Sequence, residues 1–187
     1  MENHRVLRAV IAHPNAPRHI SVPCLRDLYT FELAGLTLSP AVRLDVRTAA
    51  ETAILARLPG MSLGERLALA RRGSTRIDEA LLLDARSDAR VLQAALANPR
   101  LSEAALARAL QSSRASEDLV RTVCRHDSWP LRRSIQIALV RSRHTPLARA
   151  VYVAGNLPAR ILRELSEYVL PALRIELLKE LKRRGTE

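Results

Sequence analysis

Nine arginines between residues 119 and 163 form the part of this sequence best suited to chemistry. Guanidinium groups pair with phosphates and carboxylates, and this basic segment has one acid, whereas residues 1–118 have 16 arginines against 13 acids. The segment therefore predicts a surface for an acidic protein or a nucleic acid, although arginines also cover apolar edges and favour helix C-terminal ends. The candidate binding residues are Arg121, Arg125, Arg132, Arg133, Arg141, Arg143, Arg149, Arg160 and Arg163.

Asp127 is the one acid of the basic segment, and Trp129, two residues later, is the only tryptophan of the chain. Two interpretations are open for this pair. It could face a ligand, or it could be part of a turn. In the second case Asp127 or Ser128 caps the following helix, and Trp129 packs against the preceding one as a large turn residue.

The sequence has no pattern typical of a metal site or of a phosphate-binding loop. The five histidines do not form a metal-binding arrangement such as two histidines on one helix turn with a glutamate, and His13, His126 and His144 fall at expected inter-helix turns. The glycines at 60 and 64 lack the Lys-Ser/Thr that ends a phosphate-binding loop. Cys24 and Cys124 occupy apolar positions, as buried thiols do. We therefore expect neither metal nor cofactor.

The elements that must position these residues are short helices. Apolar residues occur as adjacent pairs repeated one helical turn later, as in Val91/Leu92 with Ala95/Leu96. Such pairs mark a broad apolar stripe on a helix of about three turns. The stripes recur every 14 residues in this region, which predicts a helix and a turn repeated as a two-helix unit of nearly 30 residues.

The turns between the stripes contain prolines and capping residues. Asn98-Pro99 ends one helix because proline disfavours a helical conformation in the residue before it. Ser102 can then cap the next helix, with Leu101 and Leu106 forming a hydrophobic staple. Ser39-Pro40 and Thr145-Pro146 also predict helix starts. In each pair a hydroxyl residue caps the helix and proline takes the first helical position. We expect 12 or 13 helices, of which 39–58 is the longest.

Composition agrees with an all-α fold. Leucine and alanine dominate and aromatic residues make up 3% of the chain, which leaves little material for a β-sheet core. A length of 187 residues suits one domain, 1–187. With no apolar run of about 18 residues and no signal-type start, a cytoplasmic protein is expected.

The segment 81–106, with an acidic turn, a helix and then Asn-Pro, resembles a unit of HEAT-like or leucine-rich-repeat-variant proteins, and the segments 137–151 and 9–20 resemble further copies of its inter-helix corner. This resemblance implies a right-handed α-solenoid that binds other macromolecules. The 14-residue spacing is shorter than the roughly 40 residues of a usual HEAT unit, and the variant family's cysteine-rich iron–sulfur segment is missing, so the subfamily stays open. A compact irregular helical bundle is the alternative fold.

Two functions follow from these features. The first is a non-enzymatic interaction module whose basic surface, residues 119–163, binds an acidic protein or nucleic acid. The second comes from the resemblance, because some HEAT-like solenoids are alkylpurine DNA glycosylases; it would make Asp127 and Trp129 catalytic candidates that stabilise a positively charged base or sugar. An open groove shared by both side chains would favour the enzyme, and a packed turn would favour the module.

Overall fold

A computed structural model describes residues 2–13 and 15–185, and over these residues the protein is all-helical, with 13 α-helices, three short 3-10 helices and no strand. The α-helices are α1 (Glu2–Ala12), α2 (Arg18–Cys24), α3 (Thr30–Leu38), α4 (Leu44–Arg57), α5 (Leu63–Arg72), α6 (Thr75–Leu82), α7 (Ala89–Leu96), α8 (Glu103–Gln111), α9 (Glu117–Arg125), α10 (Arg133–Arg141), α11 (Leu147–Ala154), α12 (Ala159–Ser166) and α13 (Pro171–Arg183). The 3-10 helices are η1 (Leu25–Asp27), η2 (Leu58–Gly60) and η3 (Trp129–Leu131).

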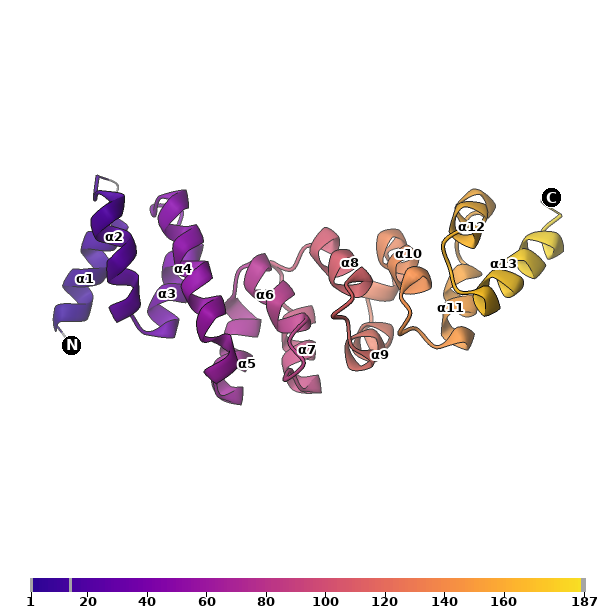
Figure 1. Ribbon diagram of the computed structural model, residues 1–187, viewed down its shortest axis with the longest axis horizontal. Helices are drawn as coiled ribbons and strands as arrows, with labels where there is room; N and C mark the ends of the chain where they lie inside the picture. The colour runs from indigo at the N-terminus through magenta and orange to yellow at the C-terminus, as the bar shows by residue number, and fades with distance from the viewer. Residues whose placement is uncertain (1, 14, 186–187) are drawn as a thin grey trace.

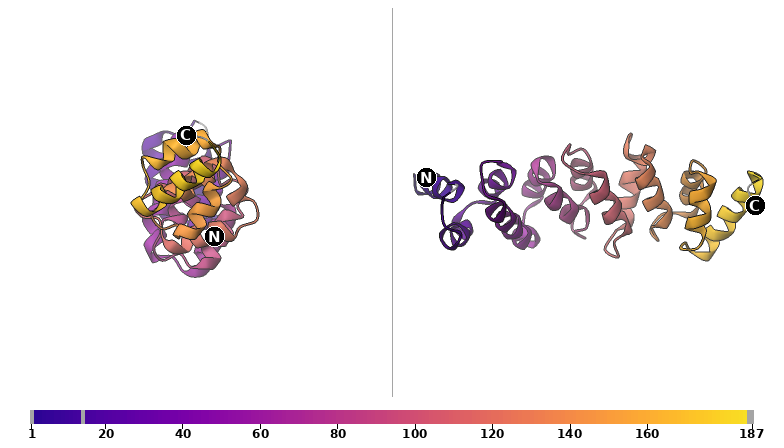
Figure 2. Two further views of the ribbon diagram at one scale, coloured as in Figure 1. Left: turned by 90° about the vertical axis from the view of Figure 1, so that its right-hand side faces the viewer. Right: turned by 90° about the horizontal axis from the view of Figure 1, so that it is seen from above.

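The helices follow one another along the long axis of an elongated molecule, with the two termini at opposite ends (Figure 1). The two further views show the same elongated outline from above and a narrow cross-section from the end (Figure 2). Helices two apart in the chain contact each other, α5 with α7 and α7 with α9 on one side, and α4, α6, α8, α10 and α12 in succession on the other. Each helix is thus packed mainly by near neighbours in the sequence.

The buried residues are those of the apolar pairs. On α7 the side chains of Val91, Leu92, Ala95 and Leu96 are all buried, and the matching positions of α8 and α9 join the same core. Helices of this length are marginal alone in water, so burial of these stripes against neighbouring helices stabilises them. None of the helices in the described part of the chain combines the length and the apolar character that a membrane span requires.

The corner between α7 and α8 has the predicted cap. The Ser102 hydroxyl accepts a hydrogen bond from the Ala105 amide at 3.2 Å, and Leu101 and Leu106 are both buried in the core. The Asn98 side chain does more than end a helix. It is buried, and its Nδ2 donates to the Gly73 carbonyl at 3.2 Å and to an Asp78 carboxylate oxygen at 2.7 Å.

Two other predicted helix starts were wrong. The segment after Ser39 forms a turn before α4 begins at Leu44, because the Val42 amide bonds the Ser39 carbonyl and Val42 is buried. Pro146 is the N-cap residue of α11 and not its first helical residue: its backbone is extended, and its carbonyl accepts from the amides of Arg149 and Ala150. Proline serves here because an N-cap contributes its carbonyl, and its own N–H is not needed.

Removal of the cap at Ser102 tests the corner. Ser102→Ala should lower the free energy of unfolding by about 1 kcal/mol, because one amide at the start of α8 loses its acceptor. Ser113→Ala is the matched control, since Ser113 is an exposed corner serine with no side-chain hydrogen bond among the described residues. Chemical denaturation of the two variants measures the difference, and equal midpoints would contradict the capping role.

Asp78 makes stability depend on pH. Burial raises the pKa of this carboxyl to about 8 from 3.8, and the Arg100 guanidinium and the Asn98 amide only partly oppose the rise. Because the folded state binds this proton more tightly, the stabilisation is complete below about pH 4 and is lost as the pH rises through about 8. Asp78→Asn removes the titration. As the pH rises from about 4 to about 8, the free energy of unfolding of wild type should fall by a few kcal/mol relative to that of the variant. Denaturation at several pH values measures this difference, and parallel pH curves would refute the prediction.

Candidate functional site

Trp129 closes a packed turn. The ring is 5% exposed, and its Nε1 donates to the carbonyl of Leu96, the last residue of α7, at 2.9 Å. The Arg132 guanidinium lies over the ring, 4.3 Å from its centroid, and also pairs with Glu103 at 3.5 Å. Trp129 is therefore a buried turn residue, as the turn interpretation predicts, but its hydrogen bond is with the end of α7 and not with the preceding helix, α9.

Asp127, unlike Trp129, is at the surface. Its side chain is exposed and lines a cavity of about 350 Å³ between α7 and α9, together with Arg121 and Arg125. The predicted cap is absent: among the described residues neither Asp127 nor Ser128 caps η3, and the Ser128 amide instead bonds His126 Nδ1 at 3.2 Å. The structure thus places Asp127 in an open cavity and Trp129 in a packed turn, so the two do not share a groove.

A second cavity of about 470 Å³ lies between α9 and α11, and we call it the α9–α11 cavity. It is lined by α9, by the corner that joins α10 to α11, and by α11 itself. The lining residues are Glu117, Val120, Arg121, Cys124 and Arg125 of α9, Arg143, His144, Thr145 and Pro146 of the corner, and Arg149 of α11. Four of the nine arginines of the basic segment therefore surround one cavity, with one acid among them.

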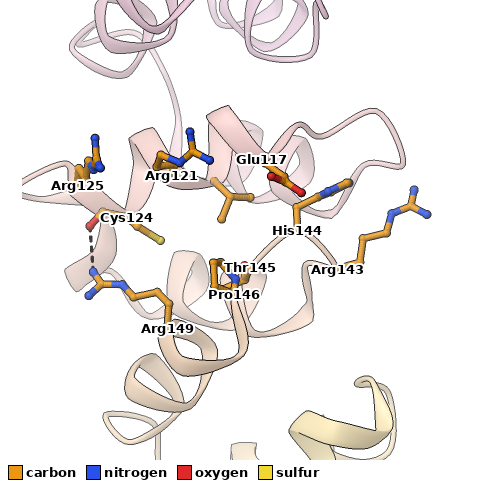
Figure 3. Close-up of a pocket in the computed structure, with 10 residues that line it drawn as sticks. Glu117, Arg121, Cys124, Arg125, Arg143, His144, Thr145, Pro146 and Arg149 are labelled. Atoms are coloured by element: carbon orange, nitrogen blue, oxygen red, sulfur yellow. Dashed lines mark hydrogen bonds between the residues drawn. The ribbon is translucent and has the colours of Figure 1, made fainter.

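The four guanidinium groups surround the cavity without converging on one point. Figure 3 shows Arg121 and Arg125 on the α9 side, Arg149 reaching back to the Cys124 carbonyl, and Arg143 turned away from the other three. Arg121 pairs with Asp118 at 3.0 Å, whereas Arg125 has no ion pair or hydrogen-bond partner within residues 2–13 and 15–185. Such an arrangement suits a ligand with several negative charges better than a single small anion.

Arg121 and Arg125 stand between the two cavities. They are one helical turn apart on α9, and both line the α9–α11 cavity and the cavity that contains Asp127. Residues four apart lie on the same helix face, so the two charges form a short exposed ridge.

Arg143 belongs to a structural series that sequence reasoning missed. Its Nη2 donates to the Ser113 carbonyl at 3.0 Å, and Arg114 donates in the same way to the Leu83 carbonyl at 3.3 Å. Arg86 bonds the Pro59 carbonyl, and Arg57 bonds the Leu28 carbonyl at 2.7 Å. We call these four the corner arginines: each links its own corner to the one about two helices earlier, and they recur every 28 or 29 residues.

Arg149 also bonds backbone, through Nη2 to the Cys124 carbonyl at 2.9 Å. The carbonyls that hold Arg143 and Arg149 satisfy hydrogen bonds without cancelling charge, because a carbonyl is neutral. Both arginines therefore keep a formal positive charge for an anionic ligand. Arg143 and Arg149 thus donate hydrogen bonds to the backbone and also contribute positive charge to the site.

The other arginines of the basic segment lie outside the α9–α11 cavity. Arg160 pairs with Glu164 on α12 at 3.4 Å, and Arg163 is an exposed residue of the same helix. Arg133 and Arg141, at the two ends of α10, are exposed, and the described part of the chain offers neither of them an ion pair or hydrogen bond. The sequence-predicted set therefore divides into one group around a cavity and five residues elsewhere.

The cysteines and histidines do not assemble into a centre. Both thiols are free and only partly buried, and the described residues contain no group of three histidine, cysteine or acidic side chains that could hold a metal ion. His13 and His126 lie at corners, and the Nδ1 of each accepts a hydrogen bond from a backbone amide, of Asn15 and of Ser128, at 3.2 Å.

Comparisons with protein-family models, curated proteins and solved structures find no match to this chain.

The role of Arg143 can be separated from its charge. Arg143→Gln should lower the free energy of unfolding by about 1 kcal/mol, because the link to the Ser113 carbonyl is lost. Arg141→Gln, two residues away, removes the same charge from an exposed residue and should change stability by less than about 0.5 kcal/mol. Thermal or chemical denaturation distinguishes them. Equal effects would mean that the corner arginines do not link the corners energetically.

Proposed function

We propose that this protein is a non-enzymatic interaction module, a cytoplasmic HEAT-like or leucine-rich-repeat-variant α-solenoid that presents a basic surface to an acidic macromolecule. The observation that carries the proposal is the grouping of Arg121, Arg125, Arg143 and Arg149 around the α9–α11 cavity against one glutamate. The partner is an acidic protein or a nucleic acid.

Several features support the solenoid part of this proposal, whose right-handed sense is what the resemblance implies. Helices two apart contact each other along both sides of the molecule. The corner arginines recur at the length of one two-helix unit, and their bonds join equivalent carbonyls in successive units. Repeat proteins are built from such units, each in contact with its neighbours, and they use the extended surface for binding.

The glycosylase-like alternative has less support. It would need Asp127 and Trp129 beside the same ligand, and the cavity that Asp127 lines does not include Trp129. Trp129 is buried and donates to a helix-end carbonyl, so its ring has no free face for an extruded base. Enzymes of that kind rely on stacking of the flipped base between aromatic or apolar side chains.

A paired substitution tests the basic surface. Arg121→Gln with Arg125→Gln removes two charges from the ridge on α9, and Arg71→Gln with Arg72→Gln removes two from exposed positions at the end of α5. The first variant should lose about tenfold in affinity for polyglutamate or duplex DNA at about 50 mM salt, and the loss should shrink at about 200 mM as screening increases. The control should lose much less.

Fluorescence anisotropy with labelled polyglutamate and labelled duplex DNA measures both affinities. Equal losses in the two variants would show that net charge alone attracts polyanions, and the proposed surface would then be wrong. Polyglutamate and DNA responses, compared at the two salt concentrations, assign the partner to an acidic protein or to a nucleic acid.

A further inference from the structure

The α9–α11 cavity has an apolar floor beneath its arginines. Val120 is 1% exposed and belongs to the core, and Cys124 and Pro146 line the same cavity from α9 and from the corner. Figure 3 shows the Cys124 sulfur turned toward the corner residues Thr145 and Pro146. A ligand that fills this cavity would therefore contact both apolar atoms and guanidinium groups.

Arg149 is already ordered at this cavity. The Cys124 carbonyl holds its Nη2 at 2.9 Å, and its guanidinium carbon lies 5.1 Å from the centre of the Tyr152 ring. A ligand that pairs with Arg149 therefore pays less conformational entropy than one that must order a free arginine. Arg125 adds an exposed charge from α9.

We infer that the α9–α11 cavity binds an acidic peptide segment of a partner protein, with one apolar side chain on the floor and carboxylates on Arg121, Arg125 and Arg149. This inference rests on the proposed function and names the partner class. The volume, about 470 Å³, is that of a typical ligand pocket. Burial of an apolar side chain provides affinity, and the surrounding charges provide orientation and attraction.

A nucleic acid fits the same cavity less well. A sugar-phosphate backbone offers negative charge but no apolar side chain for the floor. Single-stranded bases would need aromatic surfaces on which to stack, and the described residues that line the cavity include no tryptophan, tyrosine or phenylalanine and one small ring, that of His144. Charge complementarity together with the apolar floor therefore favours the peptide.

The two cysteines supply a test with an internal control. Cys124 lines the cavity, whereas Cys24 is at the end of α2, toward the other end of the molecule, and both thiols are free and partly buried. The probes are two blocked peptides, Glu-Glu-Leu-Glu-Glu and Glu-Glu-Gly-Glu-Glu. The leucine peptide should slow alkylation of Cys124 by iodoacetamide and leave the rate at Cys24 unchanged.

Affinity measured by calorimetry provides the second readout, and it decides the matter if Cys124 reacts too slowly to follow. The leucine peptide should bind about tenfold more tightly than the glycine peptide, because only the former buries an apolar side chain. Arg121→Gln with Arg125→Gln should reduce its affinity by about tenfold, and Arg71→Gln with Arg72→Gln should not.

The outcomes separate this inference from the proposed function. Equal affinities for the two peptides, with arginine-dependent binding of polyglutamate retained, would overturn the inference and leave the basic surface in place. Protection of Cys124 by duplex DNA but not by the leucine peptide would assign the cavity to nucleic acid and would also overturn it. Failure of every anionic probe to bind would overturn the proposed function as well.

Discussion

The amide of Asn98 joins two corners of the chain on which the neighbouring helices depend. Its two donor bonds reach the Gly73 carbonyl and Asp78, and its oxygen accepts the Arg100 amide at 3.0 Å. Every polar atom of the side chain is thus used in a buried place, where an unpaired group would cost about 1–3 kcal/mol. Helices of two or three turns hold their positions here because such corner contacts set where each one begins and ends.

Most of the fold could be predicted from the sequence, because it depends on local patterns. The apolar pairs of α7, α8 and α9 predicted buried stripes, and Ser102 predicted a cap, because a stripe and a cap are each visible within a few residues. The starts of α4 and α11 were misplaced. Both errors came from proline, which fits an N-cap, a turn or a first helical position equally well until the neighbouring helix decides.

The candidate site was predictable only in part. The sequence showed the excess of arginines in residues 119–163, and the structure brings four of the nine to one cavity. The floor of that cavity could not be foreseen, since Val120 and Pro146 are close only after α9 and α11 have packed. The corner arginines did leave a signal, a spacing of 28 or 29 residues, but that signal does not distinguish a charge that faces solvent from one that bonds a carbonyl.

Arginine therefore serves two purposes in this protein. Arg57, Arg86, Arg114 and Arg143 use guanidinium geometry to reach carbonyls of an earlier corner, a task for which the planar fork of donors suits arginine better than lysine. Arg125 has no such bond among the described residues, and its charged side chain is exposed to solvent. The near absence of lysine, 2 against 28 arginines, agrees with a large structural share of these cations.

The short reach of the links between corners also affects how the chain folds. The bond from Asn98 to Gly73 spans 25 residues, and the bond from Trp129 to Leu96 spans 33. Formation of such a link closes a loop of modest length, and the entropic cost of loop closure grows only slowly with length, by about 0.6 kcal/mol for each doubling. Chains dominated by contacts close in sequence fold quickly. Each stretch of about two helices can therefore form its tertiary contacts before the distant parts of the chain have folded.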